Sequence, residues 1–449
     1  MNSFEKLEQL CDLIVDCPHS TPKWTNSGYL VIRNQNIIDD ILDFSNPSYT
    51  DQENYQYRVR RVKPTVGDIV ITREAPMGRV CLIPENVECC LGQRQVLLRP
   101  NTNLIDNNYL YWALKSPFVQ AQIMLNDGTG ATVSNMRIPA LKALKIPRLG
   151  LKREKKISTF LSILNKKIQL NTQINQTLEQ IAQTIFKSWF IDFDPVRAKA
   201  DALANGATSE QANLCAMQII SGKSESELNA WQTTHPTEYQ QLYKLAEAFP
   251  SEFDSVDGVE VPKEWRVEQL SEQFDFISGS QPPKSQHIYQ EQSGYERFIQ
   301  NRDYANDNHK TYIPISKKNK LCEDKDILMD KYGEAGKVRY GIKGAYNVAL
   351  AKIVPKKENM REFLRWYFMQ ENIKSYLSQA SMASTRNSLN SSTFMGMEVD
   401  IPNDEILIYF ENMVSQYIDR SLQIKRENNF LSELRDYLLP KLLNGEIKL

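Results

Sequence analysis

The sequence predicts an α+β protein made of two tandem β-rich modules, each followed by a long helix. Short motifs of the first half of the 449-residue chain recur in the second half. Gly67-Asp68-Ile69 corresponds to Lys325-Asp326-Ile327, and Gly78-Arg79-Val80 corresponds to Gly336-Lys337-Val338. After each module, apolar residues recur at steps of seven, which is the pattern of a coiled-coil helix. The chain therefore contains an internal repeat, and we expect it to present two similar surfaces.

The first module, residues 1–150, reads as mixed structure that leans towards β. Short β-rich runs bounded by Gly, Pro and Asn predict strands at 29–32, 68–72, 80–83 and 95–98. Apolar residues at three- and four-residue steps predict a helix at 107–125, and a last short strand is expected at 144–147. The second module, 263–402, repeats this order, with its helical pattern at 363–376.

Two long helices are predicted, at 151–192 and 403–440. A polar Asn171 lies inside the first heptad seam, and Arg420 and Glu427 lie in the second, where they weaken the seam or select its partner. The candidate helix-pairing residues are Ile157, Leu164, Leu178 and Ile185 in the first helix, and Phe410, Tyr417, Ile424, Leu431 and Leu438 in the second.

Charge separates the segment between the repeats from the rest of the chain. Residues 201–260 hold ten acidic residues and two lysines, a net charge of −8, so the remainder carries +7 within a total of −1. A mildly basic remainder permits phosphate contact. The predicted segments are the first module at 1–150, the first long helix at 151–192, an acidic helical insertion at 193–262, the second module at 263–402, and the second long helix with a C-terminal tail at 403–449. Within the insertion, short helical patterns are expected at 214–220 and 239–249.

Composition also bears on location and metal binding. No run approaches the roughly 20 apolar residues of a membrane span, and the N-terminus does not read as a signal peptide, so we expect no membrane association. The seven cysteines are scattered without a Cys-x-x-Cys pair, which predicts a reducing cytoplasm and no metal site.

The ends of the long helices carry distinctive motifs, FKSWFIDFDPVR at 186–197 and LRDYLLPKLLNGEI at 434–447. With the order module, helix, spacer, module, helix, they make the chain resemble, over nearly its whole length, the specificity subunit of type I restriction-modification systems. Module sequences vary in that family, so the resemblance does not tell which DNA bases this chain recognises.

The resemblance implies that each module is a target recognition domain that reads one half of a bipartite site in double-stranded DNA. It implies two long antiparallel coiled-coil helices that hold the domains apart, in an internal pseudo-two-fold repeat. Two methyltransferase subunits, which bind S-adenosylmethionine and methylate adenine, and up to two restriction subunits, which use ATP and Mg, would join a chain that is itself non-catalytic and holds no cofactor. The localisation would be the prokaryotic cytoplasm.

Helix geometry suits this role. A helix of about 40 residues spans about 60 Å, and two DNA-reading surfaces on one face of a duplex lie about 35 Å apart. Because the loops of the two modules differ, the two half-sites should differ as well, and the expected site is asymmetric.

The loops that follow the module strands hold side chains suited to reading base edges, such as Arg for guanine and Asn or Gln for adenine. Lys317, Lys318 and Lys320 would suit phosphates. The alternative is that these polar loops are only exposed to solvent and do not contact DNA. The candidates are Arg33, Asn34, Gln35, Arg73, Gln93, Arg94, Thr132, Ser134, Asn135 and Arg137 in the first module, and Gln300, Asn301, Arg302, Lys331, Tyr332, Thr385, Arg386 and Asn387 in the second.

Other functions remain open from the residues. The tetrapeptide Asn46-Pro47-Ser48-Tyr49 has the form of the motif with which amino-methyltransferases bind their target amine, but it lacks a Gly-rich cofactor loop upstream, so a turn is favoured. The alternatives are an independent restriction or modification enzyme, a non-catalytic protein-interaction scaffold, and the DNA-recognition subunit of a related modification system outside type I.

Overall fold

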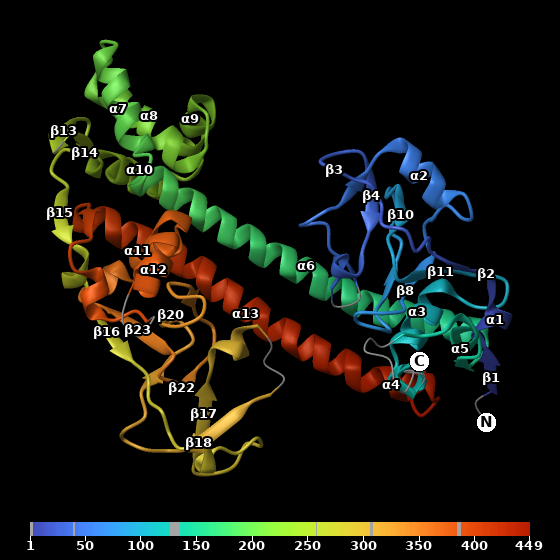
Figure 1. Ribbon diagram of the computed structural model, residues 1–449. Coiled ribbons are helices and arrows are strands. Elements are labelled where there is room, and N and C mark those ends of the chain that lie inside the picture. The colour runs from blue at the N-terminus through green and yellow to red at the C-terminus, as the bar shows by residue number, and fades with distance from the viewer. Residues whose placement is uncertain (1–2, 39–40, 126–134, 257, 306–308, 384–387) are drawn as a thin grey trace. The chain divides into compact units, whose positions relative to one another are not determined.

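The chain folds into two compact units in this computed structural model, which describes residues 3–38, 41–125, 135–256, 258–305, 309–383 and 388–449. Unit 1 comprises residues 1–172 and 426–449, and unit 2 comprises residues 173–425. Two long helices, α6 (Leu151–Phe190) and α13 (Asp404–Leu443), contribute to both units (Figure 1). Among the described residues, none of the helices is long and apolar enough for a membrane span.

Unit 1 holds the first module, in which short strands alternate with short helices. Its helices are α1 (Leu7–Leu10), α2 (Gln52–Val59), α3 (Asn107–Lys115), α4 (Pro117–Leu125) and α5 (Ile138–Lys142). Its strands are β1 (Ser3–Lys6), β2 (Cys11–Asp16), β3 (Trp24–Thr25), β4 (Tyr29–Ile32), β5 (Ile37–Ile38), β6 (Ile41–Leu42), β7 (Tyr49–Thr50), β8 (Ile69–Thr72), β9 (Val80–Leu82), β10 (Cys89–Leu91), β11 (Gln95–Pro100) and β12 (Lys145–Arg148).

Two four-stranded sheets form the body of the first module, in the orders β2-β11-β8-β9 and β10-β4-β7-β3. The first is antiparallel throughout, whereas β10 pairs with β4 in parallel. All four residues of β8 are buried, which explains its unbroken run of branched apolar residues and Thr72. The predicted helix at 107–125 is two helices, because the chain turns at Ser116 and Pro117 begins α4.

The core of unit 1 contains both long helices. Ile157 and Leu161 of α6 and Leu442 of α13 are fully buried in one cluster with the side chains of α3. Polar contacts fix the packing: the Asp106 carboxylate caps α3 and also accepts a 2.7 Å hydrogen bond from the Ser158 hydroxyl of α6. The start of α6 and the end of α13 are therefore anchored in the first module.

Unit 2 holds the second module. The helices of this module are α11 (Arg361–Phe368) and α12 (Glu371–Ala383), and unit 2 also contains parts of α6 and α13 and the helices of the acidic insertion. Its strands are β13 (Phe253–Val256), β14 (Val259–Pro262), β15 (Arg266–Gln269), β16 (Phe274–Ser278), β17 (Tyr295–Ile299), β18 (Thr311–Pro314), β19 (Leu321–Cys322), β20 (Ile327–Asp330), β21 (Val338–Arg339), β22 (Gly344–Tyr346), β23 (Leu350–Pro355) and β24 (Glu398–Ile401).

The sheets of the second module have the orders β16-β23-β20-β21 and β18-β17-β22-β19. Strand β17 pairs in parallel with β22, as β4 does with β10 in unit 1. The order β16-β23-β20-β21 also corresponds, strand for strand along the chain, to β2-β11-β8-β9. The repeated motifs of the sequence therefore lie in matching strands: Asp68-Ile69 at β8 and Asp326-Ile327 at β20.

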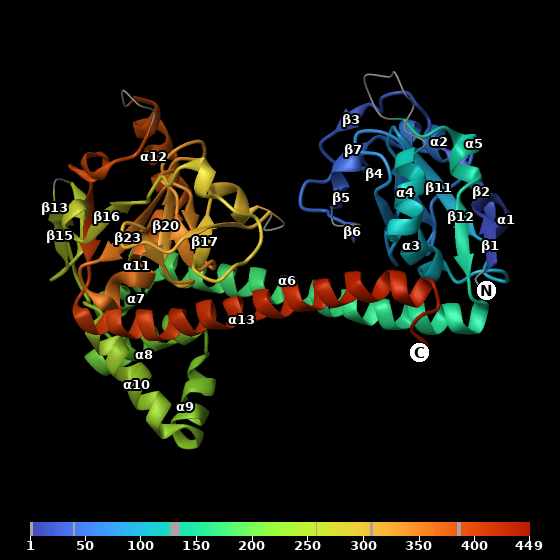
Figure 2. The same cartoon turned by 90° about the horizontal axis from the view of Figure 1, so that it is seen from below.

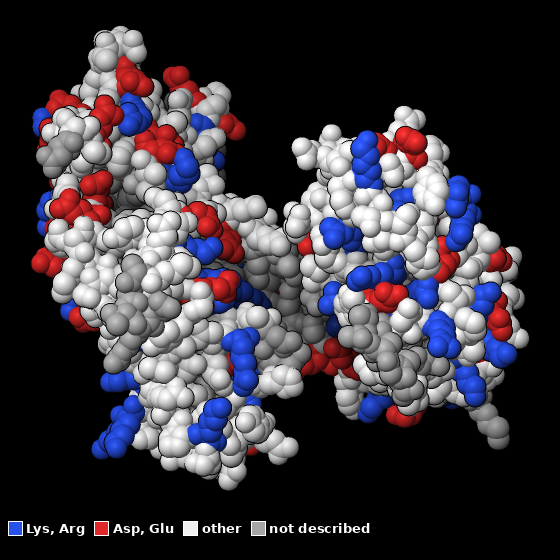
Figure 3. Space-filling model, viewed as in Figure 1, with Lys and Arg blue, Asp and Glu red and all other residues white. Residues whose placement is uncertain are grey.

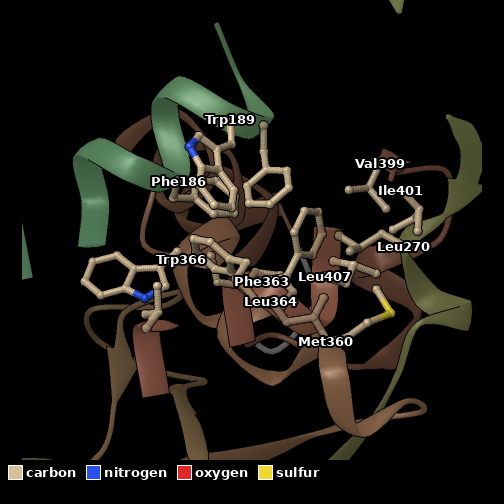
Figure 4. Close-up of a cluster of buried hydrophobic side chains, with 14 of the residues drawn as sticks. Phe186, Trp189, Leu270, Met360, Phe363, Leu364, Trp366, Val399, Ile401 and Leu407 are labelled. Carbon is tan, nitrogen blue, oxygen red and sulfur yellow. The ribbon is translucent and has the colours of Figure 1, made fainter. Parts of the chain in front are cut away.

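Aromatic side chains from the end of α6 form the centre of unit 2. Figure 4 shows Phe186 and Trp189 of α6 directed towards Phe363, Leu364 and Leu407. The nearest ring pairs join Phe190 to Phe410 and to Phe363, with centroids 5.0 and 5.1 Å apart. Such contacts add stability beyond the area they bury. The motif at the end of the first long helix is thus a packing element of the second module.

The acidic insertion is a set of four helices, of which the sequence predicts only two. Patterns at 214–220 and 239–249 fall on α8 (Ser209–Ser221) and α10 (Pro236–Ala248), whereas α7 (Asp194–Ala204) and α9 (Glu225–Thr234) are additional. Within unit 2, α8–α10 lie on the opposite side of the long helices from the sheets (Figure 2). Helix α6 ends at Phe190, Phe193 takes a left-handed backbone, and α7 begins at Asp194 with Pro195 in its first turn.

The long helices pack against each other antiparallel within each unit. In unit 1 Asn171 is buried and donates from Nδ2 to Glu427 Oε2 at 3.1 Å and to Asn428 Oδ1 at 2.9 Å. In unit 2 the rings of Phe186 and Phe410 lie 6.0 Å apart. Of the residues predicted to pair the helices, Ile157, Phe410 and Ile424 are buried, and Leu164, Leu178, Ile185, Tyr417, Leu431 and Leu438 are half-buried.

The predicted seam of α13 is only part of what this helix buries. Leu407, Val414, Ile418 and Leu422 are also buried, in the cluster that includes α11, because α13 packs on the second module as well as on α6. Arg420, which the heptad pattern puts in the seam, is exposed and bonds Gln423, whereas Glu427 pairs across to Lys167 at 3.4 Å.

Candidate nucleic-acid interface

In unit 1, most of the described candidate residues gather where strands of both sheets end. The Gly92 amide donates to Ile32 O at 2.7 Å, and the Arg73 amide to Arg94 O at 2.8 Å, so the ends of β4 and β8 are joined through the turn before β11. The Met136 amide donates in turn to Arg73 O. We call this region, residues 16, 33–35, 73–74, 93–94 and 135–137, the strand-end surface of unit 1.

Arg73 lies beneath this surface and is engaged on every side. Its Nη1 donates to Asp16 Oδ2 at 2.7 Å, its Nε to Met136 O at 2.9 Å, and its Nη2 to Asn135 Oδ1 at 3.3 Å. The residue is 9% exposed. Such a charge-assisted network fixes the relative positions of the groups that it joins.

Glu74 connects three further candidates. Its Oε1 accepts from Asn135 Nδ2 at 2.9 Å, and its Oε2 lies 3.5 Å from Arg94 Nε. Its backbone carbonyl accepts from Asn34 Nδ2. Arg73 and Glu74 therefore cross-link four segments that are far apart in the sequence, at residues 16, 34, 94 and 135–136.

The remaining candidates of unit 1 differ in whether their side chains already have contacts within the protein. The Arg33 guanidinium lies over the Trp24 ring, 4.9 Å from its centroid, and Gln93 bonds His19 O and Thr21 Oγ1. The exposed candidates are Gln35, Arg94 and Arg137, and of these Arg94 is also paired with Glu74.

Unit 2 builds its corresponding surface with the same backbone bonds. The Asn347 amide donates to Ile299 O at 3.0 Å, the Lys331 amide to Ala349 O at 2.8 Å, and the Leu389 amide to Lys331 O at 3.2 Å. Lys331 thus occupies the position that Arg73 has in unit 1. We call residues 278–280, 300–302, 331–332 and 347–349 the strand-end surface of unit 2.

The side chains of this second surface form fewer internal bonds. Lys331 Nζ donates to Ser278 Oγ at 2.8 Å and lies 5.7 Å from the centroid of the half-exposed Tyr332 ring. Gln300 Nε2 and Arg302 Nη2 both donate to Thr311 Oγ1, at 3.2 and 3.4 Å. Asn301 Oδ1 is buried without a hydrogen-bond partner.

The turn between β18 and β19 presents the three lysines predicted to contact phosphates. Lys317, Lys318 and Lys320 are exposed, and Asn319 between them donates to Pro314 O at 3.0 Å, which stabilises the turn. Figure 3 shows Lys and Arg side chains over the β17–β18 end of unit 2, and several acidic side chains over α7–α10.

Some predicted candidates cannot be placed, and some residues of the two surfaces were not predicted. Thr132, Ser134, Thr385, Arg386 and Asn387 lie outside the described residues. The structure adds residues that sequence reasoning missed, each of which a search for acids or hydroxyls at strand ends would have found: Asp16 and Ser278 close β2 and β16, and Glu74 follows β8.

The Asn-Pro-x-Tyr tetrapeptide is part of the framework. Asn46 O accepts from Asn36 Nδ2 at 3.2 Å, and Ser48 O accepts from the Val31 amide at 2.8 Å. Tyr49 belongs to β7. The Ser48 bond joins the tetrapeptide to β4, and the segment is a bend that leads into β7 rather than the predicted turn.

The chemistry of both surfaces is that of hydrogen bonds and ionic contacts. Within the ranges that the structure describes, no three or more His, Cys, Asp or Glu side chains are grouped so as to hold a metal ion. Burial raises the pKa of the Cys11, Cys89 and Cys322 thiols to about 12, which keeps them protonated. Guanidinium, amide and ammonium groups at strand ends suit the recognition of a polyanion with readable edges.

Comparison with known proteins bears on this interpretation. Residues 6–180 and 262–423 match the family model of the type I restriction modification DNA specificity domain. The chain is 35% identical over 406 residues to the type I restriction enzyme HindI specificity subunit of Haemophilus influenzae, covering 85% of this chain and 86% of that protein. It is 25% identical over 397 residues to the MjaIX specificity subunit of Methanocaldococcus jannaschii, covering 85% and 78%.

The fold is similar to a solved one. The crystal structure of a type I restriction-modification S subunit from M. genitalium matches with a TM-score of 0.58 at 15% identity, covering 98% of this chain and 96% of that one. The two matched segments of the family model correspond to the two modules with the first part of each long helix, and residues 181–261, which include the acidic insertion, lie between them.

Proposed function

The chain belongs to the family of type I restriction modification DNA specificity domains, and on this basis we propose that it reads an asymmetric, bipartite DNA site, one half with each module. The observation that carries the proposal is the pair of strand-end surfaces. They share backbone bonds but differ in side chains: Gln93 and Arg94 stand where unit 2 has Val348 and Ala349. A common frame with different donors and acceptors suits the reading of two different sequences.

The proposal assigns recognition to this chain and catalysis to its partners. Methyltransferase subunits would bind S-adenosylmethionine and methylate adenine, and restriction subunits would use ATP and Mg. The cells would be prokaryotic, with the complex acting on DNA in the cytoplasm. The two long helices would form one antiparallel coiled coil, and the modules would be the two copies of a pseudo-two-fold repeat.

One face of α6 supports docking of a methyltransferase subunit. Ile163 and Leu170 are 60% and 53% exposed, seven residues apart on the same side of the helix. The side that faces α13 is different, because Asn165 and Asn171 bond residues of α13 there. Exposed aliphatic side chains in line on a helix mark a surface suited to a partner.

Two measurements test the proposed function. The full chain, co-purified with its methyltransferase subunits, should bind duplex DNA with an affinity that falls as salt rises. Mapping of methylated adenines in the DNA of the host should give one split sequence with unlike halves. Salt-independent binding, or binding of protein alone, would favour a protein-interaction scaffold.

Methylation or cleavage by the chain without partners would favour an independent enzyme. A methylated sequence with two identical halves would contradict the asymmetric assignment while leaving DNA recognition in place.

A further inference from the structure

The two strand-end surfaces hold a cation at the same position but neutralise it differently. Arg73 follows β8 and Lys331 follows β20, and both are tied by equivalent backbone bonds to the turn before β11 or β23. Their exposed fractions are nearly equal, at 9% and 8%. The two side chains are therefore equally buried, and they differ only in the chemistry of the groups that bind them.

In unit 1 the cation has a counter-charge. The Asp16 carboxylate accepts from Arg73 at 2.7 Å, and two further acceptors take up Nε and Nη2. These bonds use three of the five guanidinium N–H groups, and the Asp16 carboxylate neutralises the charge, so little net positive charge is left to attract an anionic ligand. Arg73 therefore holds Asn135 and Met136 in place.

In unit 2 a hydroxyl stands where unit 1 has the carboxylate. Asp16 pairs with Val96 in the β2–β11 ladder, and Ser278 pairs with Ala351 at the same place in the β16–β23 ladder. Lys331 Nζ has three donors, and Ser278 Oγ takes one of them.

Nearby carboxylates already have cationic partners. Asp330 and Glu334 both lie 2.8 Å from Arg339 Nη2. Across the described part of the chain, no carboxylate forms an ion pair with Lys331. A buried ammonium group with a neutral partner is costly unless an anion reaches it.

Two neighbouring groups at this surface also lack partners. Ser280 Oγ and Asn301 Oδ1 are buried without a hydrogen bond. Ser280 bridges to Asn347, whose amide is bonded to Ile299 O just before Asn301, so both groups belong to the strand-end surface of unit 2. The Ser280 hydroxyl can donate to an anion, whereas Asn301 Oδ1 can only accept, so of these two atoms only Ser280 Oγ suits an anionic ligand.

We propose that Lys331 binds a phosphate oxygen of the DNA backbone, and that Arg73 is a positioning residue that makes no such contact. The proposal rests on the proposed function in DNA recognition. It assigns one more ionic contact to the second module than to the first at this position, as a consequence of the exchange between Asp16 and Ser278.

The test is the salt dependence of DNA binding by the full chain in complex with its methyltransferase subunits. The probe is a duplex that carries the sequence methylated by the wild-type complex. Each phosphate contact adds about 0.9 to the slope of log affinity against log salt. Lys331→Gln should lower the slope by about 0.9, which is about 3.5-fold less loss of affinity over a fourfold rise in salt.

Matched variants separate contact from structure. Ser278→Asp should lower the slope as Lys331→Gln does, because it gives Lys331 the counter-charge that Arg73 has, and it adds an ion pair, so the fold is retained. Lys331→Arg and Arg73→Gln should both keep the wild-type slope, and Arg73→Gln should in addition lower the thermal stability of unit 1.

The charge control is Lys356→Gln, which removes a lysine paired with Asp275 at the other end of β23.

The outcomes that overturn the proposal are distinct from those that overturn the function. Wild-type slopes for both Lys331→Gln and Ser278→Asp would reject the phosphate contact. A lowered slope for Arg73→Gln would reject its assignment as a positioning residue. Loss of salt dependence in the wild-type complex itself would instead reject DNA recognition.

Discussion

At the scale of single residues, Lys199 shows how a buried charge can close a helix. Its Nζ donates to the carbonyl oxygens of Ala246, at 2.9 Å, and Phe249, at the C-terminal end of α10. These carbonyls have no partner within the helix. A cation at this end is also stabilised by the partial negative charge of the helix dipole. Burial nevertheless lowers the pKa of Lys199 from 10.5 to about 8.

The lowered pKa of Lys199 predicts a pH dependence of stability. The folded state favours the neutral amine, so the contribution of this group is fully present above 10.5 and is lost as pH falls through 8. Between these values the free energy of unfolding of the wild type, relative to Lys199→Met, should rise with pH by up to about 1.4 kcal/mol per unit. Denaturant unfolding at several pH values measures this difference. Lys244→Met, at an exposed position on α10, should give a flat difference, and a flat difference for Lys199→Met would contradict the prediction.

At the scale of elements, a polar residue specifies how the long helices meet in unit 1. Asn171 is 1% exposed and bonds both Glu427 and Asn428, and Asn428 Nδ2 returns a bond to Ile168 O at 3.2 Å. Such bonds are satisfied in one register only, because sliding the helices would leave buried polar groups unpaired.

Removal of this contact should be measurable. Asn171→Ala deletes two hydrogen bonds and leaves Asn428 Oδ1 short of a donor, which should lower the free energy of unfolding by about 1–2 kcal/mol. The control is Asn429→Ala, an exposed asparagine on α13, which should change stability by less than about 0.5 kcal/mol. Equal effects of the two substitutions in chemical denaturation would show that the buried contact is not the cause.

The exposed face of α6 predicts a separate effect on assembly. Ile163→Glu with Leu170→Glu should leave the chain folded, because both side chains are exposed, but should reduce co-purification of the methyltransferase subunit. Gln176→Glu, about 120° around α6 from Leu170, should have no effect. Undiminished co-purification of the double variant would place the docking surface elsewhere.

At the scale of the whole molecule, duplication with divergence makes recognition divisible. Each unit has its own sheets, core and strand-end surface. Exchange of residues 1–150 for the equivalent module of a relative should therefore change one half of the methylated sequence, and exchange of 263–402 the other half. Mapping of methylated adenines in both hybrids checks this, and a change in both halves after a single exchange would show that the modules do not read independently.

Local pattern was sufficient for the two long helices and for several strands of the first module. The strands at 29–32, 69–72, 80–82 and 95–100 and the helices at 151–190 and 404–443 follow from runs, periods and bounding residues. The patterns failed where context decides, as at α7 and α9, whose short amphipathic runs gain their stability from packing within the insertion.

For the site, the sequence by itself determined that there are two related sets of polar residues at strand ends, and which family carries such sets. Only the tertiary structure decided that Arg73 is bound by Asp16 and Met136 while Lys331 faces a hydroxyl, and that the end of α6 is a core element of unit 2. The physical reason is that burial and partner depend on residues distant in the chain, and neither is encoded in the local period or composition.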